Sequence, residues 1–102
     1  MDKEQALNIA KEYTDEIKKK YNVLSVYLFG SFAKGNESEN SDIDLAIVLK
    51  TNDNILDTQL DLMRLRRKID LRIEPHPYTE STFDVSDPVV NEILKYGLAL
   101  EM

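Results

Sequence analysis

The sequence contains no cysteine among its 102 residues, so disulfide bonds and thiolate metal ligands are both excluded. This absence fits a reducing compartment such as the cytoplasm. No stretch is long and apolar enough to predict a membrane span, and residues 1–5 lack the character of a signal peptide. Basic residues are few, 13 against 19 acidic ones, which gives a formal net charge of −6. We therefore expect no membrane partner and no direct, non-specific binding of nucleic acid, since that affinity comes from basic side chains that neutralise phosphates.

The composition that remains is that of a globular protein, with 42% hydrophobic and 31% charged residues. The length predicts one small domain over residues 1–102, without internal repeats. Apolar periodicity predicts long helices over 3–20 and 55–68, a short helical turn over 31–34, and a third long helix that Asp87-Pro88 caps and Gly97 ends. Apolar runs and alternation predict strands over 23–29, 42–49, 69–74 and 98–100.

Two of the predicted elements, the second long helix and the third strand, carry more specific expectations. The second long helix should bury one inner stripe, made of Ile55, Leu56, Leu60 and Met63. Its basic end, Arg64 to Lys68, suits the negative end of a helix dipole, and a docking patch for an acidic partner or an RNA backbone is the alternative. The strand over 69–74 should end at Pro75 and Pro77.

Two short polar motifs border the first two apolar runs. The first run ends in Gly30-Ser31, and the second carries Asp42 and Asp44 at its head, ten residues after Ser31. On a strand, side chains two positions apart share a face, so Asp42 and Asp44 should lie side by side. Adjacent carboxylates repel each other, and such a pair mainly serves to hold a hard cation such as Mg²⁺.

The Gly30-Ser31 pair predicts the other half of a site. Glycine has no Cβ, so a ligand can approach its backbone closely, and serine is a favoured first residue of a helix. A strand that breaks here into a short helix would point backbone N–H groups at an anion. Either motif alone is more typical of a hairpin loop with a polar strand end, but together they favour a phosphate cradle that faces a metal-binding pair.

This combination resembles the signature of the nucleotidyltransferases related to DNA polymerase beta. The stretches Gly30–Gly35 and Ser41–Leu45 are similar to the minimal nucleotidyltransferase branch, and the resemblance extends from about Tyr21 to the C-terminus. It implies an α/β (α+β) nucleotidyltransferase fold, a small mixed β-sheet with helices packed mainly on one face. It also implies transfer of AMP from ATP with Mg²⁺, most simply two ions, while Gly30 and Ser31 hold the β- and γ-phosphates.

A two-metal site needs a third carboxylate on a neighbouring strand. Asp70 is the first choice because it lies near the head of the predicted strand, as Asp42 does, and the resembled family has an acidic residue in such a strand. Glu74 is the second choice. The expected catalytic and metal-binding residues are therefore Asp42, Asp44 and Asp70, with Gly30 and Ser31 as nucleotide-binding residues. The roles of three further residues stay open: Lys34, which could reach a phosphate or be solvated, Arg72, and His76, whose place between two prolines is more typical of a structural residue.

The resemblance also implies a partner. Minimal nucleotidyltransferases pair with a helical HEPN protein in toxin–antitoxin modules, in which the nucleotidyltransferase is the antitoxin and transfers AMP to a tyrosine of the toxin. Because the chain is short after the third predicted strand, we expect the acceptor to come from another protein. Two alternatives remain: an antitoxin that neutralises its partner by occlusion without catalysis, and a small-molecule nucleotidyltransferase, such as one that acts on an aminoglycoside.

Overall fold

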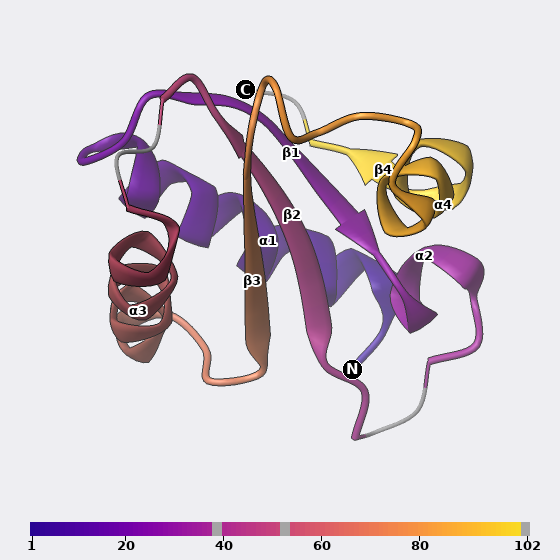
Figure 1. Cartoon of the computed structure of the whole chain (residues 1–102). Coiled ribbons are helices and arrows are strands. Elements are labelled where there is room, and N and C mark those ends of the chain that lie inside the picture. Colours follow the sequence, from indigo (N-terminus) through magenta and orange to yellow (C-terminus); the bar gives the residue numbers. More distant parts are fainter. Residues whose placement is uncertain (38–39, 52–53, 101–102) are drawn as a thin grey trace.

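The computed structural model describes residues 1–37, 40–51 and 54–100, and within them helices flank one β-sheet (Figure 1). The strands are β1 (Val23–Phe29), β2 (Ile43–Leu49), β3 (Ile73–Thr79) and β4 (Leu98–Ala99). The helices are α1 (Lys3–Lys18), α2 (Ser31–Lys34), α3 (Ile55–Leu65) and α4 (Pro88–Tyr96), with a 3₁₀ turn, η1 (Arg66–Lys68), after α3.

The sheet is mixed, with strand order β3-β2-β1-β4. β1 pairs antiparallel with β2 and β4, whereas β2 pairs parallel with β3. β1 and β2 are central, and every residue of β2 except Asp44 is buried. This arrangement confirms the predicted fold class, a small mixed sheet with flanking helices.

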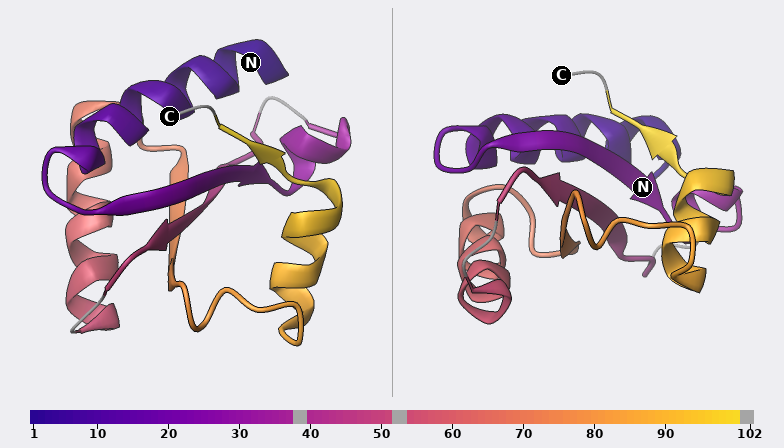
Figure 2. Two further views of the ribbon diagram at one scale, coloured as in Figure 1. Left: turned by 90° about the horizontal axis from the view of Figure 1, so that it is seen from above. Right: turned by 45° about the horizontal axis from the view of Figure 1, so that its top comes forward.

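The main core lies between the sheet and α1, which runs along one face (Figure 2). Asp2 and Gln5 form a reciprocal capping box that fixes the start of α1. Tyr13 is fully buried, and its hydroxyl donates a 2.6 Å hydrogen bond to the backbone carbonyl of Leu62 in α3. The buried face of α1 and the core residues of the sheet that pack with it are Ala6, Ala10, Tyr13, Ile17, Val26, Leu28, Ile43, Leu45 and Ile47.

The predicted inner stripe of α3 is wrong. Leu56 and Leu60 are 72% and 63% exposed, and the helix instead buries Thr58, Asp61 and Leu62. The reason is the position of α3, which lies beside the edge strand β3 and so buries only a narrow stripe (Figure 1). A polar residue takes part in that stripe because Lys20 and Tyr21, in the turn after α1, satisfy the carboxylate of Asp61.

The predicted bounds of the third strand are also wrong, since β3 covers Ile73–Thr79 and contains both prolines. β3 is an edge strand, and the carbonyls of Ile73 and Pro75 accept hydrogen bonds from side chains of Arg66 and Gln59 rather than from another strand. An edge strand tolerates proline where the missing N–H would point away from the sheet. The prolines therefore protect this edge from further pairing instead of ending the strand.

Across the described ranges, no helix combines the length and the apolar character that a membrane crossing requires.

Candidate active site

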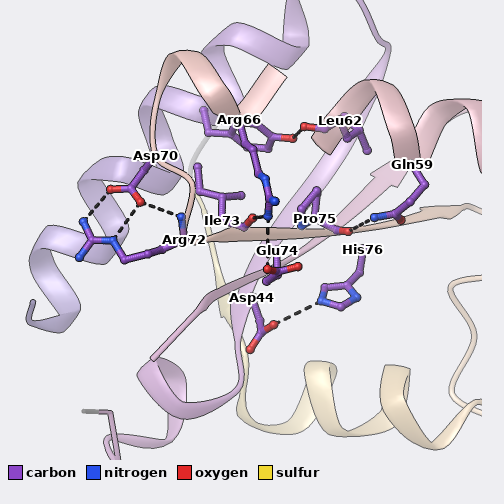
Figure 3. Close-up of polar contacts among 11 residues, drawn as sticks. Asp44, Gln59, Leu62, Arg66, Asp70, Arg72, Ile73, Glu74, Pro75 and His76 are labelled. Atoms are coloured by element: carbon purple, nitrogen blue, oxygen red, sulfur yellow. Dashed lines mark hydrogen bonds and ion pairs between the residues drawn. The ribbon is translucent and has the colours of Figure 1, made fainter. Parts of the chain in front are cut away.

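The face of the sheet opposite α1 carries polar groups at one end. In the strand register Asp44 of β2 lies between Phe29 of β1 and Glu74 of β3, and His76 follows two residues after Glu74 on the same face. Figure 3 shows Asp44, Glu74 and His76 close together, on adjoining strands. The predicted site therefore lies where β1 ends and β2 begins.

The rest of this face is covered. Phe83, in the segment between β3 and α4, packs against Tyr27 and Tyr78, with ring centroids 5.4 and 5.2 Å apart. Ala46, which lies beside Tyr27 in the register, is fully buried. α4 also lies on the side of the sheet away from α1 (Figure 2). A ligand consequently has access to the end of the face that carries Asp44 rather than to its centre.

Gly30 and Asp44 form the closest contact of the site. Gly30 has φ 77° and ψ −147°, a conformation that residues with a side chain rarely adopt. A Cβ at this position would lie 2.5 Å from Oδ2 of Asp44. Only glycine therefore lets the end of β1 pass directly against the Asp44 carboxylate, as the predicted cradle requires.

Helix α2 fixes the backbone that follows Gly30. Phe32 is fully buried, and Gly35 closes the turn with φ 77° and a backbone N–H that bonds the carbonyl of Ser31. Lys34 forms an ion pair with Glu92 of α4 and lies over the ring of Tyr96, 5.6 Å from its centroid. Its amino group thus joins α2 to α4, a role that the sequence did not predict.

Donor groups hold two of the acidic side chains on this face. Nε2 of His76 lies 3.3 Å from Oδ1 of Asp44, and the His76 ring packs edge-on against Phe29. Nη1 of Arg66 donates to Oε1 of Glu74 at 3.2 Å and to the carbonyl of Ile73 at 2.8 Å (Figure 3). Hydrogen bonds of this kind restrict the orientation of carboxylates that bind metals.

Asp70 occupies a different environment from the one predicted. It lies in the turn before β3, where its carboxylate accepts hydrogen bonds from Nε and Nη2 of Arg72, at 2.9 and 2.6 Å, and from the Arg72 backbone N–H. These bonds hold the pKa of Asp70 below its ordinary value. The placement of Asp70 within a strand was wrong, because the chain turns at 70–72 and the strand starts at Ile73.

The predicted carboxylates are not all brought together. Asp42 is exposed, immediately before β2, and Asp44 follows two residues later. Among the residues that the structure describes, no three histidine, aspartate or glutamate side chains form a ready-made metal-binding group. The expected convergence of Asp42, Asp44 and Asp70 is therefore not present.

Two carboxylates are nevertheless enough for the way in which proteins usually bind Mg²⁺ together with a nucleotide. Mg²⁺ prefers oxygen ligands and is usually bound by one or two carboxylates together with substrate phosphates. Asp42 and Asp44 would supply the carboxylates, and the backbone at Gly30 reaches Asp44 without an intervening side chain. Bound there, Mg²⁺ would neutralise phosphate charge and polarise the phosphorus that is attacked.

Comparison with known proteins gives the family. The profile of the polymerase beta nucleotidyltransferase family matches residues 8–87. A relative in Methanocaldococcus jannaschii, provisionally named protein adenylyltransferase MJ1305, is 34% identical over 71 residues. That match covers 68% of this chain but 46% of the relative, so the chain corresponds to less than half of the relative's length.

Solved structures agree with the fold. A provisionally assigned nucleotidyltransferase from Sulfolobus solfataricus aligns with a TM-score of 0.68 and 27% identity, over 95% of this chain and 80% of that one. A toxin–antitoxin structure with AMP-PNP aligns with a TM-score of 0.65 and 21% identity, over 93% of this chain and 72% of that one. A mixed sheet that carries Gly30-Ser31 and Asp42-x-Asp44 at one end defines a nucleotidyltransferase domain, and this chain belongs to the polymerase beta nucleotidyltransferase family.

Sequence reasoning missed Arg66 and His76 as neighbours of the site. Both follow from the true extent of β3, because a strand through Pro75 puts His76 on the same face as Glu74 and leaves the outer edge for Arg66. The signal was the alternation Glu74, His76, Tyr78, which continues past the prolines.

Proposed function

We propose that this chain transfers AMP from ATP, with Mg²⁺, to a hydroxyl group of a partner toxin, and that it acts as the antitoxin. The observation that carries the proposal is the contact between Gly30 and Asp44, where a backbone free of side chain adjoins a carboxylate at the head of β2. This arrangement suits a triphosphate that must lie beside a metal-binding group.

In this proposal Gly30 and Ser31 bind the β- and γ-phosphates, while Asp42 and Asp44 hold Mg²⁺. The hydroxyl oxygen of the acceptor forms a bond to the α-phosphorus, and the bond from that phosphorus to the bridging oxygen breaks. Pyrophosphate leaves with the electron pair of that bond, and the hydroxyl proton passes to the third carboxylate. Positioning and charge neutralisation supply most of the catalysis in such transfers.

Glu74 is a better third carboxylate than Asp70. Glu74 pairs directly with Asp44 in the parallel register, on the same face of the sheet. Asp70, in contrast, is bound on both oxygens by Arg72. Use of Asp70 would break that bidentate ion pair, so we assign the role to Glu74 and treat Asp70 as the alternative.

The partner assignment rests on similarity. The relative MJ1305 carries the name of a protein adenylyltransferase, and one structural neighbour is a toxin–antitoxin that contains an ATP analogue. We propose a helical toxin of the HEPN type as the acceptor and a tyrosine as the modified residue, since a tyrosine hydroxyl extends far enough to enter an exposed site. AMP on that tyrosine would add negative charge and bulk to the toxin.

The test uses the product of the adjacent gene, if it encodes a small helical protein, with ATP and Mg²⁺. Intact-mass measurement should show AMP-sized increments on the partner with the wild-type chain and none with Asp42→Asn plus Asp44→Asn. Glu12→Gln, an exposed carboxylate of α1 changed in the same way, is the matched control and should retain transfer. An unmodified partner whose toxicity is still suppressed would favour occlusion, and label on a small molecule alone would favour the aminoglycoside type of reaction.

A further inference from the structure

The outer face of α3 carries an apolar stripe that stays largely exposed in the described part of the chain. Leu56 and Leu60 are among the most exposed large hydrophobic residues, and Ile55 beside them is 47% exposed. The stripe continues to the half-buried Met63, and the exposed Arg67 follows in η1. The spacing of four and three residues between Leu56, Leu60 and Met63 is that of the contact positions in a coiled coil. Such spacing favours a second helix, packed lengthwise, as the missing contact.

Opposite charges lie on one flank of this stripe, near its two ends. Asp57 is in the first turn of α3 and Arg64 is in the last, seven residues later and so on the same side of the helix. Asp57 has no ion-pair partner among the described residues. Arg64 is 70% exposed and approaches Asp61 only to 3.6 Å.

Asp61 does not need Arg64. Its carboxylate already accepts a hydrogen bond from the hydroxyl of Tyr21 and lies 2.6 Å from Nζ of Lys20. Arg64 is therefore available for a carboxylate of another molecule, as Asp57 is available for a cation.

We propose that α3 is a self-association surface, on which α3 of a second copy packs antiparallel across a two-fold axis near Leu60. In this arrangement each Asp57 faces Arg64 of the second copy, and Leu60 packs near Met63 of the second copy. A two-fold interface must be self-complementary, and the opposite charges on this flank meet that requirement. In a parallel pair, each of these residues would instead lie beside the same residue of the second copy, so that like charges would meet.

α3 has 11 residues, about one and a half heptads, so the interface falls at the small end of specific interfaces and the dimer is weak. It also leaves the candidate active site accessible, because α3 lies on the β3 side of the sheet while α2 and α4 lie on the other side (Figure 1). The proposal goes beyond the transfer reaction and does not depend on it.

Sedimentation equilibrium over a wide range of protein concentration tests this directly. The wild-type chain should show a reversible monomer–dimer equilibrium, and Leu60→Glu should abolish the dimer. Leu94→Glu, at a leucine of α4 that is 44% exposed, is the matched control and should leave the equilibrium unchanged.

Charge reversal then tests the orientation. Asp57→Arg and Arg64→Asp should each weaken dimerisation by at least about tenfold, because each change creates two like-charge contacts. The double variant restores both pairs and should recover most of the affinity. Circular dichroism of each variant establishes that the helix is retained. A monomeric wild type at the highest concentration, equal effects of Leu60→Glu and Leu94→Glu, or a double variant as weak as the singles would each overturn the proposal.

Discussion

Two pairs of aspartates in this protein, Asp61 with Asp70 and Asp42 with Asp44, lie in contrasting environments. Asp61 and Asp70 are each held by several donors within the same chain, Asp61 by Tyr21 and Lys20 and Asp70 by Arg72. At the head of β2, by contrast, Asp42 is exposed, and Asp44 has, among the described residues, only the longer contact with His76 at 3.3 Å. Asp61 and Asp70 are thus neutralised by side chains of the same chain, whereas Asp42 and Asp44 have fewer partners among the described residues, as the proposed Mg²⁺ site requires.

Removal of the carboxylates of Asp42 and Asp44 should have the largest effect on function. Asp42→Asn plus Asp44→Asn should lower the rate of AMP transfer by about a thousandfold or more, since metal-ion charge stabilisation supplies several kcal/mol. The same variant should be as stable as the wild type without Mg²⁺, because two carboxylates no longer repel each other. Thermal melting with and without Mg²⁺ measures this, and a large loss of stability without metal would show that the pair is structural.

Gly30→Ala and Gly35→Ala should both strain the backbone, but only Gly30→Ala should also disturb the candidate active site. Gly35→Ala should cost about 1 kcal/mol of unfolding free energy, because Gly35 is in the left-handed region with ψ 17°. Gly30→Ala should cost more, about 1–3 kcal/mol, because ψ −147° puts Gly30 in a region that is nearly restricted to glycine. Only at Gly30 would the new Cβ meet a side chain within 4 Å, namely the carboxylate of Asp44. Urea denaturation should therefore give the larger loss for Gly30→Ala, and transfer, measured where both variants are folded, should fall at least about tenfold for Gly30→Ala alone. Equal activity of the two variants would refute the role of the Gly30–Asp44 contact.

How far the sequence predicted this site depends on the region. The turn at Gly30 and the position of Asp44 followed from local rules, since a strand that ends in Gly-Ser and one that begins in Asp-x-Asp need no knowledge of their neighbours. The third carboxylate did not follow, because it depends on whether β3 is an edge strand, and only edge strands tolerate Pro75 and Pro77. The exposed stripe of α3 was missed for a related reason, as periodicity indicates an apolar face but not what covers it.

The two candidates for the third carboxylate can be separated by single variants. Glu74→Gln should reduce the rise in melting temperature that Mg²⁺ with ATP produces, and Asp70→Asn should leave that rise intact while lowering the melting temperature itself. Arg66→Gln should resemble a weaker form of Glu74→Gln, by about tenfold in metal affinity, because it releases the Glu74 side chain. The reverse order, with Asp70→Asn abolishing the rise, would return the role to Asp70.

The smallest expected effect concerns how the free energy of unfolding falls at acidic pH. Hydrogen bonds from Lys20 and Tyr21 hold the pKa of the buried Asp61 below its ordinary value of 3.8. The stabilisation from Asp61 is therefore complete above that value and is lost as the pH falls through the lower, folded-state pKa. Asp61→Asn should lower stability at pH 7 and flatten its decline in acid. Urea denaturation from pH 7 to pH 3 measures both, and an unchanged slope would place the pH dependence elsewhere.

The central claim is that the Gly30–Asp44 junction binds ATP together with Mg²⁺. Isothermal titration of the purified chain with ATP tests it without a partner protein. We predict binding by the wild type and by Glu12→Gln when Mg²⁺ is present, and none without Mg²⁺ or with Asp42→Asn plus Asp44→Asn. ATP binding of equal strength in the absence of Mg²⁺, or in the double variant, would contradict the account.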